Sequence, residues 1–296
     1  MKQISIFLLA VVLALFCACI SKSGKQARID SKALIIGVTQ KPTYPDVITH
    51  AIKPQLEKKG YTIKLVQLDD QRVFNQTLVD GEVDINIGQH EAALNFEKAN
   101  NPKWRISALI TVPSAHMGIF SDKYQVKDIE ELKKAVRKGD VVAMPDDVTN
   151  LSRSLIFLEN TGFIKLREDK DKFATTEKDI AENYYGLEYR VLKAEQIPRV
   201  LSSIGIGLIY GDDADLLGIL EQAIIREVDE SDLFLNTFVV RDETLEAQPQ
   251  WLKDFVEAVQ SETFKNVIED PQYRFHKYYR PSWYREKWGI ANEYGK

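Results

Sequence analysis

The segment PDDVTNLSRSL, residues 145–155, places Asn150 and Arg153 where helix-like sequence resumes after an apolar run. Thr149 or Asn150 is predicted to cap this helix, so that its first backbone N–H groups point outward beside Arg153. The N-terminus of a helix carries partial positive charge, so an arginine in the first turn is unfavourable unless an anion binds there. Free N–H groups and a planar guanidinium together suit a carboxylate or phosphate ligand.

The same stretch also allows a purely structural interpretation. Arg153 could pair with Asp146 or Asp147 and serve only to close the loop. Both interpretations remain open on these residues alone.

The elements that must position these side chains alternate between strand and helix. Strands are predicted from buried apolar runs at 32–40, 61–70, 83–90, 105–115, 116–124, 140–147, 188–195 and 206–214. Helices are predicted at 46–60, 73–82, 128–139, 150–160 and 196–205. The runs 105–115 and 116–124 are expected to form a strand pair. This alternation predicts an α/β fold with a mostly parallel sheet, or two such sheets.

Ligands of open α/β sheets bind beyond the carboxyl ends of the strands, so polar strand ends are the candidate positions. Four strand ends are polar and each precedes a predicted helix: TQKPTYPD (39–46), GQHEAA (88–93), PDDVTN (145–150) and YGDDA (210–214).

Catalysis is the rival class of function. The acid pairs in PDD and GDD could perform acid–base chemistry or bind a cation if they met in one cleft. The sequence has no Gly-x-Ser-x-Gly elbow, phosphate-binding glycine loop or His-Glu-x-x-His motif. His90 and His116 have no evident nucleophile or metal-ligand companion and are interpreted as packing residues. The chain is therefore predicted not to be an enzyme and not to require a cofactor or a metal ion.

The N-terminus has the plan of a secretory signal peptide, with Lys2 followed by an apolar stretch from residue 4 to about 16. The closing FCAC resembles a bacterial lipobox, although Phe16 stands where leucine is preferred. By that resemblance residues 1–18 are the signal peptide, Cys19 is lipidated and 19–31 form a tether. An ordinary cleaved signal and an uncleaved anchor are the alternatives.

Composition bounds the remaining possibilities. Of the two cysteines in the 296-residue chain, Cys17 lies in the predicted signal and Cys19 would be lipidated, so no disulfide is expected in the mature protein. Hydrophobic residues make up 44% of the chain, enough for one large or two modest domains. The net charge of -5, with mixed signs, argues against nucleic acid as a partner.

A series of motifs resembles one protein family. IIGVT, VDINIGQH, MGIFS, MPDDVTNLSRSL, GFIKL, LKAEQIPRVL, LIYGDDA and FVVRDE follow the lipobox in the order of the NlpA-type methionine-binding lipoproteins. These are substrate-binding subunits of bacterial methionine ABC importers, and the resemblance runs to about Asp270. It implies a two-lobed periplasmic-binding-protein fold of type II, whose lobes close on a ligand in the cleft between them. Lobe one would comprise 32–115 and 235–296, and lobe two 116–234.

The resemblance also implies roles for particular residues. Arg153 corresponds to the residue that holds the α-carboxylate of the ligand, and Asn150 to its polar neighbour. Gln89 and His90 correspond to the Gln-His of the family pocket. The transfer favours a carboxylate ligand for Arg153 over a structural ion pair.

Several pocket positions depart from the family pattern. Gln71 and Gly88 stand where relatives have aromatic residues, and Ala92-Ala93 replaces Pro-Tyr. Large apolar walls contribute roughly 1–3 kcal/mol each, so their loss is enough to redirect specificity.

One further departure concerns the amino group of the ligand. Tyr210 replaces an asparagine that helps to fix this group in relatives. Asp212 or Asp213 could take over as partner of an ammonium. Alternatively, both acids simply face solvent after a strand.

The sequence thus predicts a lipid-anchored substrate-binding protein of an ABC importer that binds methionine, a related amino acid or a short peptide through its carboxylate. Its partners would be a permease with its ATPase. It would be localised to the bacterial cell envelope, with the folded domain in the periplasm or on the extracellular face. The alternative is a surface lipoprotein with an adhesin or interaction role, suggested by the basic aromatic tail 273–289. More plainly, this tail would be a helix and loop packed on lobe one.

Overall fold

The structure is a computed structural model that describes residues 32–68, 71–169, 171–228 and 231–291, except the side chains of Gln71 and Arg72. The predicted signal, Cys19 and the tether lie outside the described residues. The chain divides into two compact units. The first comprises the described part of Met1–Ile87, with Arg105–Ser107 and Val239–Lys265, and the second comprises Gly88–Trp104, Ala108–Phe238 and Asn266–Lys296. The lobe boundaries expected from the family resemblance stay a prediction.

A five-stranded sheet has the order β2 (Thr62–Gln67), β1 (Ala33–Val38), β3 (Ile85–His90), β12 (Asn236–Arg241) and β4 (Ile106–Thr111). β1 runs parallel to β2 and to β3. The inward side chains of β1, Leu34, Ile36 and Val38, are fully buried, as is typical of strands in a covered parallel sheet. The predicted strands at 32–40, 61–70 and 83–90 are confirmed.

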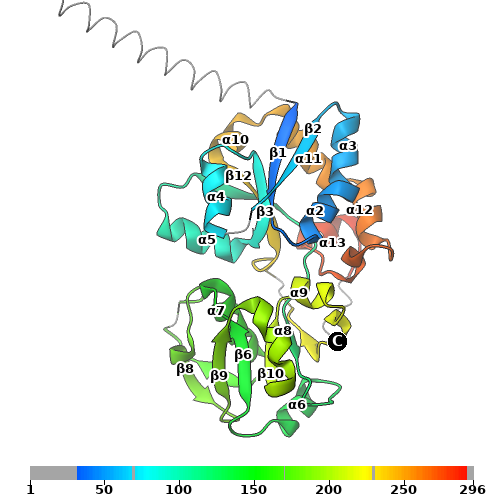
Figure 1. Cartoon of the computed structure of the whole chain (residues 1–296). Coiled ribbons are helices and arrows are strands. Elements are labelled where there is room, and N and C mark those ends of the chain that lie inside the picture. The colour runs from blue at the N-terminus through cyan, green and yellow to red at the C-terminus, as the bar shows by residue number, and fades with distance from the viewer. Residues whose placement is uncertain (1–31, 69–70, 170, 229–230, 292–296) are drawn as a thin grey trace, which may run out of the picture. The chain divides into compact units, whose positions relative to one another are not determined.

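The predicted helix at 46–60 is confirmed as a continuous helical segment with an irregular middle. It consists of α2 (Thr43–Val47), a π-helical stretch (Ile48–Ile52) and α3 (Lys53–Lys58). Gly60 follows with φ of +83°, a left-handed conformation that glycine adopts without strain. α3 lies beside β2 and packs against α11 (Gln250–Val259), as Figure 1 shows. α4 (Gln71–Val79) and α10 (Asp242–Ala247) are further helices of this unit.

An ion pair joins α11 to the segment after α3. Asp254 accepts hydrogen bonds from Lys59 Nζ at 2.8 Å and from the Tyr61 hydroxyl at 2.5 Å. Burial by itself would raise the pKa of Asp254, but the hydrogen bonds from Lys59, Tyr61 and Gln250 outweigh it and lower this pKa.

This lowered pKa predicts a dependence of stability on pH. The stabilisation from ionised Asp254 is fully present above the unfolded pKa, near 3.8, and is lost as the pH falls through the lower folded pKa. At neutral pH the wild type should therefore melt at a higher temperature than Asp254→Asn. The difference should vanish at strongly acidic pH in scanning calorimetry, and a constant difference would contradict the ion pair.

A second five-stranded sheet has the order β11 (Ile225–Arg226), β5 (Gly118–Phe120), β10 (Ile206–Ile209), β6 (Val141–Pro145) and β9 (Glu188–Leu192). β10 and β9 run parallel to β6, whereas β5 is antiparallel to both β10 and β11. The expected pairing of 105–115 with 116–124 is wrong, because β4 belongs to the first sheet and β5 to the second.

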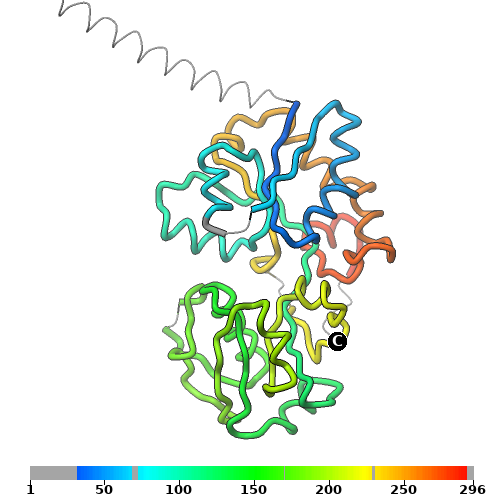
Figure 2. The backbone as a smooth tube through the Cα atoms, viewed as in Figure 1, coloured from blue at the N-terminus to red at the C-terminus, as the bar shows by residue number. Residues whose placement is uncertain are grey.

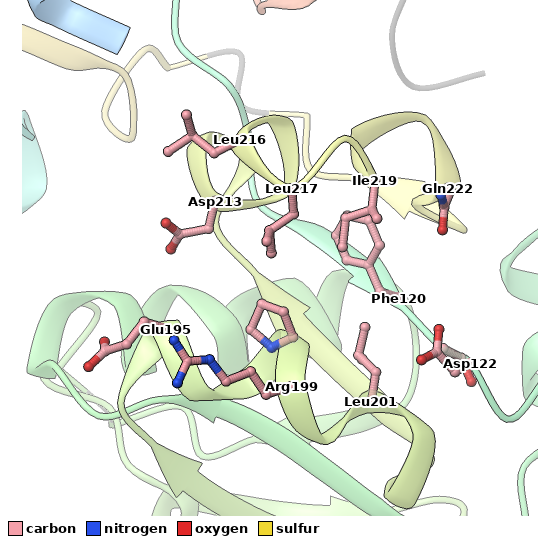
Figure 3. A pocket seen from close by; sticks show the side chains of 12 residues that line it. Phe120, Asp122, Glu195, Arg199, Leu201, Asp213, Leu216, Leu217, Ile219 and Gln222 are labelled. Carbon is pink, nitrogen blue, oxygen red and sulfur yellow. The ribbon is translucent and has the colours of Figure 1, made fainter. Parts of the chain in front are cut away.

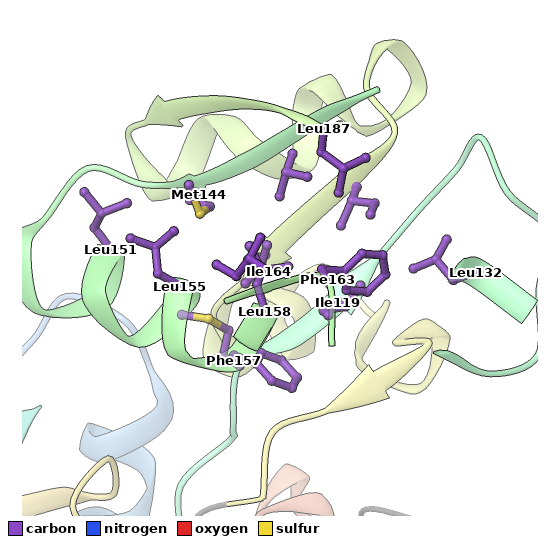
Figure 4. Packing of buried hydrophobic residues seen from close by; sticks show 14 of the residues in the cluster. Ile119, Leu132, Met144, Leu151, Leu155, Phe157, Leu158, Phe163, Ile164 and Leu187 are labelled. Atoms are coloured by element: carbon purple, nitrogen blue, oxygen red, sulfur yellow. The ribbon is translucent and has the colours of Figure 1, made fainter. Parts of the chain in front are cut away.

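The two faces of the second sheet carry different helices. Val142 and Met144 of β6 belong to a cluster with α7 (Val148–Asn160), shown in Figure 4, where Leu151 and Leu155 lie beside Met144 and Leu158 lies near Ile164. Ala143, between them in sequence, belongs to the opposite cluster with α8 (Ile197–Val200). This alternation is the period-two pattern of a strand buried on both faces.

α8 lies close to the sheet because β10 has a glycine beneath it. A Cβ atom at Gly207 would stand 3.0 Å from the Ile197 side chain of α8 and 2.6 Å from the Leu201 side chain just after it. The predicted helix at 196–205 is shorter than expected, with a 3-10 turn before α8 (Ala194–Gln196) and another after it (Leu201–Ser203).

The remaining elements are α5 (Glu91–Asn100), α6 (Ile129–Ala135), β7 (Ile164–Leu166), β8 (Ile180–Asn183), α9 (Gly211–Leu216), α12 (Glu262–Glu269) and α13 (Ser282–Trp288), with 3-10 turns at Glu177–Asp179, Leu220–Gln222 and Arg274–Lys277. No helix within the described ranges is both long and apolar enough to span a membrane.

The basic aromatic tail is folded, and in Figure 2 its chain, in red, turns back on itself. Phe275, Tyr278, Tyr279 and Tyr284 are buried, each at most 4% exposed. The tail contacts the rest of its unit through several hydrogen bonds, among them Tyr278 to Asp215, Trp283 to Thr111 and the paired backbones of Ser114 and Tyr279. These four aromatic rings therefore contribute to a core, whereas Tyr273, Trp283 and Trp288 are partly exposed.

Candidate ligand site

Arg153 is placed by α7, whose first residue is Val148. Asp147 caps this helix: its backbone is extended and its Oδ1 accepts the backbone N–H of Asn150 at 3.0 Å. The predicted cap, Thr149 or Asn150, is therefore wrong, because the acid two or three residues earlier takes that role. Arg153 lies in the second turn of the helix, beyond the free N–H groups at its start.

The guanidinium of Arg153 is paired with a carboxylate that the sequence did not suggest. Its Nε donates to Glu227 Oε2 at 2.8 Å and its Nη2 donates to the same oxygen at 2.5 Å. The two side chains are 7% and 8% exposed. The prediction that Arg153 could pair with Asp146 or Asp147 is therefore wrong. Phe234, also missed, covers one face of the guanidinium with its ring centroid 4.9 Å from Cζ.

Asp147 instead organises the polar residues around α7. Its Oδ1 also accepts Asn150 Nδ2 at 2.9 Å, and its Oδ2 accepts the Tyr210 hydroxyl. Burial, the charge of Asp147 and the hydrogen bond to it raise the pKa of Tyr210 well above its ordinary value. The phenol therefore stays protonated and donates to Asp147.

His90 joins this network from β3. Its Nδ1 accepts the backbone N–H of Ala93 at 3.0 Å and so caps α5. The ring proton must then reside on Nε2, which lies 3.1 Å from Asn150 Oδ1 and donates to it. The edge of the ring meets Phe234 at 5.4 Å between centroids. Three predicted site residues, His90, Asn150 and Tyr210, are thus linked in one chain of hydrogen bonds through Asp147.

The other predicted residues are placed less centrally. Gln89 is 2% exposed beside His90. Ala92 and Ala93 are buried in the first turn of α5, and Gly88 is half-buried in β3. Gln71 begins α4, and its side chain is outside the described part of the structure.

Asp212 and Asp213 lie in the first turn of α9 and are half-buried. A carboxylate in the first turn of a helix interacts favourably with the helix dipole, which gives both acids a structural role. Asp213 also lines a separate cavity of about 490 Å³, formed mainly by apolar side chains such as Phe120, Leu201 and Leu217 (Figure 3). None of the 12 residues around this cavity belongs to the Arg153 network.

His116 is a packing residue, as the sequence predicted. Its ring stacks on Tyr279 with 4.2 Å between centroids, and its Nδ1 donates to the backbone carbonyl of Glu227 at 2.7 Å. Among the described residues, no group of three or more His, Cys, Asp or Glu side chains could hold a metal ion.

Comparisons with known proteins show what the chain resembles. The family described as NlpA lipoprotein matches residues 34–283. The probable D-methionine-binding lipoprotein MetQ of Vibrio cholerae is 31% identical over 86% of this chain and 91% of its own length. The methionine-binding lipoprotein MetQ of Bacillus subtilis is 27% identical over 88% of this chain and 93% of its own length.

Solved structures agree with this result. A nutrient-binding protein from Burkholderia cenocepacia, bound to methionine, superposes with a TM-score of 0.70 at 27% identity, covering 80% of this chain and 95% of its own. The predicted α/β fold of the type II periplasmic-binding-protein class is confirmed by this likeness and by the two sheets. The prediction of a binding protein and not an enzyme is confirmed as well, because the matched relatives are named as binding proteins. The chain belongs to the NlpA lipoprotein family.

Proposed function

We propose that this chain is the substrate-binding lipoprotein of an ABC importer and binds methionine, a related amino acid or a short peptide through the carboxylate of the ligand at Arg153. The observation that carries the proposal is that only one edge of the Arg153 guanidinium is hydrogen-bonded within the described residues. Glu227 occupies only its Nε–Nη2 edge. An arginine has five N–H donors, and those of the Nη1–Nη2 edge have no acceptor among the residues that the structure describes.

The surroundings of this edge support a ligand site. Asn150, one turn before Arg153 on α7, is held from both sides by Asp147 and His90. Side chains fixed in this way lose little conformational entropy when a ligand binds. The methionine named for the matched relatives supports an amino acid as the ligand class.

Delivery requires a membrane anchor and a transporter. In this proposal a lipid on Cys19 keeps the chain at the bacterial envelope, and several acyl chains give durable attachment where one would not. A permease and its ATPase receive the ligand, so ATP is consumed by the partner.

A thermal-shift experiment tests the proposal. The chain is unfolded and refolded to remove carried-over ligand, and its melting temperature is then recorded with L-methionine, D-methionine, the other amino acids and short peptides. A ligand at one hundred times its dissociation constant stabilises the folded state by about 2.7 kcal/mol, a shift of roughly 5–10 °C. A selective shift supports the proposal, and no shift across the panel would overturn it.

The alternative function, a surface lipoprotein with an adhesin or interaction role, loses its main support. The aromatic side chains of the tail that suggested it are largely buried. Phe275, Tyr278, Tyr279 and Tyr284 contribute to the fold of the second unit, and Tyr273, Trp283 and Trp288 are only partly exposed.

Tyr210→Asn tests whether the altered pocket disfavours methionine. The change restores the amide expected from the family and should raise the affinity for L-methionine about tenfold, since one hydrogen bond to a charged group contributes about 1.5 kcal/mol. Tyr210→Phe is the matched control, because it removes only the hydroxyl that binds Asp147. Isothermal titration calorimetry measures both variants. Equal affinities for Tyr210→Asn and the wild type would direct attention to Gln71, Gly88 and Ala93.

A further inference from the structure

Glu227 is held more firmly than a simple counter-ion needs to be. Its backbone N–H donates to the Met117 carbonyl at 2.8 Å, and its own carbonyl accepts His116 Nδ1 at 2.7 Å. His116 is fixed in turn by its stack on Tyr279. The residue directly follows the edge strand β11, so its side chain points from a rigid position to Arg153.

Within the described residues, only one of the two oxygens of the Glu227 carboxylate accepts hydrogen bonds. Both hydrogen bonds from Arg153 end on Oε2. Oε1 accepts no hydrogen bond from any residue within the described ranges. The pair therefore offers two unused groups on two hydrogen-bonded side chains, the donors of the guanidinium edge and the second oxygen of the carboxylate.

These two groups match the two charges of an α-amino acid. A ligand carboxylate on the Nη1–Nη2 edge lies next to Glu227, because Nη2 is shared by both edges. A carboxylate alone would meet the negative charge of Glu227 there, and like charges disfavour each other in a buried setting. An ammonium on the adjacent carbon removes this repulsion, since it can donate a charge-assisted hydrogen bond to Oε1.

We propose that Glu227 accepts the α-ammonium of the ligand, so that Arg153 and Glu227 together select zwitterionic amino acids over carboxylates that lack a free amino group. This inference rests on the proposed function and specifies its ligand class. It assigns to Glu227 the role that the sequence suggested for Asp212 or Asp213. A dipeptide with a free N-terminus would satisfy the pair less well, because its ammonium and carboxylate are further apart.

The test compares two ligands that differ only in the amino group. The full chain, purified in detergent and freed of ligand by refolding, is titrated calorimetrically with L-methionine and with 4-(methylthio)butanoate, which is methionine without its amino group. The wild type should prefer L-methionine by about 30-fold or more, the factor expected for a buried charged partner. In Glu227→Gln this preference should largely disappear, because the amide is neutral.

The ratio of the two affinities separates recognition from positioning. If Glu227 only orients Arg153, both ligands weaken alike in Glu227→Gln and their ratio stays at the wild-type value, which would overturn the inference. A ratio that changes in Asp212→Asn but not in Glu227→Gln would overturn it too. Glu182→Gln, at an exposed glutamate of the same unit, is the control for the substitution itself and should leave the ratio unchanged.

The wild type provides a test that needs no variant to fold. Equal binding of L-methionine and 4-(methylthio)butanoate contradicts the inference while leaving a carboxylate-binding function intact. A wild type that binds neither these ligands nor any amino acid of the thermal-shift panel contradicts the proposed function itself.

Discussion

Arg153→Ala is expected to abolish binding of α-carboxylate ligands and also to lower the free energy of unfolding by about 3–5 kcal/mol. The first effect follows from losing the donors that hold the ligand. The second follows from the pair with Glu227, whose carboxylate is 8% exposed and would remain buried without a counter-ion. Calorimetric titration measures the binding, and scanning calorimetry of the ligand-free variant measures the stability.

A double variant separates these two effects. Replacing both partners, as in Arg153→Met with Glu227→Gln, leaves no buried charge and should recover most of the lost stability. It should still fail to bind, because the guanidinium is absent. Retained affinity in a folded Arg153→Ala protein would eliminate Arg153 as the carboxylate anchor. Unchanged stability in that variant would show that the buried pair does not form in solution.

The sequence predicted the strands and the family well, because both depend on local patterns. Apolar runs such as 32–40 and 83–90 form strands wherever a sheet buries them on both faces. The sheet to which each strand belongs is not a local property. The runs 105–115 and 116–124 follow one another directly, yet β4 and β5 lie in different sheets. Adjacent strands usually pair, and here the connection instead passes from one sheet to the other.

The candidate site was predicted only in part, because local motifs identify some of its residues and the fold alone brings the others to them. Arg153, Asn150 and His90 lie in motifs that the family resemblance carries, and the structure brings them together around α7. Glu227 is 74 positions from Arg153, so only the fold places it there. From the sequence alone the nearest acids, Asp146 and Asp147, were the obvious partners. The cap explains why Asp147 is not available, since its oxygens are taken by Asn150 and Tyr210.

Glu269→Ala should lower the free energy of unfolding by roughly 3 kcal/mol, because it removes the carboxylate on which the tail converges. Arg280 donates to Glu269 through Nε at 3.1 Å and Nη2 at 2.8 Å, and the arginine side chain is only 5% exposed. The hydroxyl of Tyr284, a fully buried side chain, donates to the same glutamate at 2.8 Å. Burial and this hydrogen bond raise the pKa of Tyr284, so the phenol remains a donor. Scanning calorimetry should show a melting temperature about 6–12 °C lower.

Glu286→Ala is the matched control, since this glutamate of α13 is exposed and should change the melting temperature little. The comparison also decides what the tail is for. If the tail is part of the core, Glu269→Ala lowers stability while the wild-type affinity for amino acids is kept below the melting transition. If Glu269→Ala and Glu286→Ala melt alike, the tail does not stabilise the unit. Its aromatic residues would then be free to act as an interaction surface, and the adhesin alternative would regain its support.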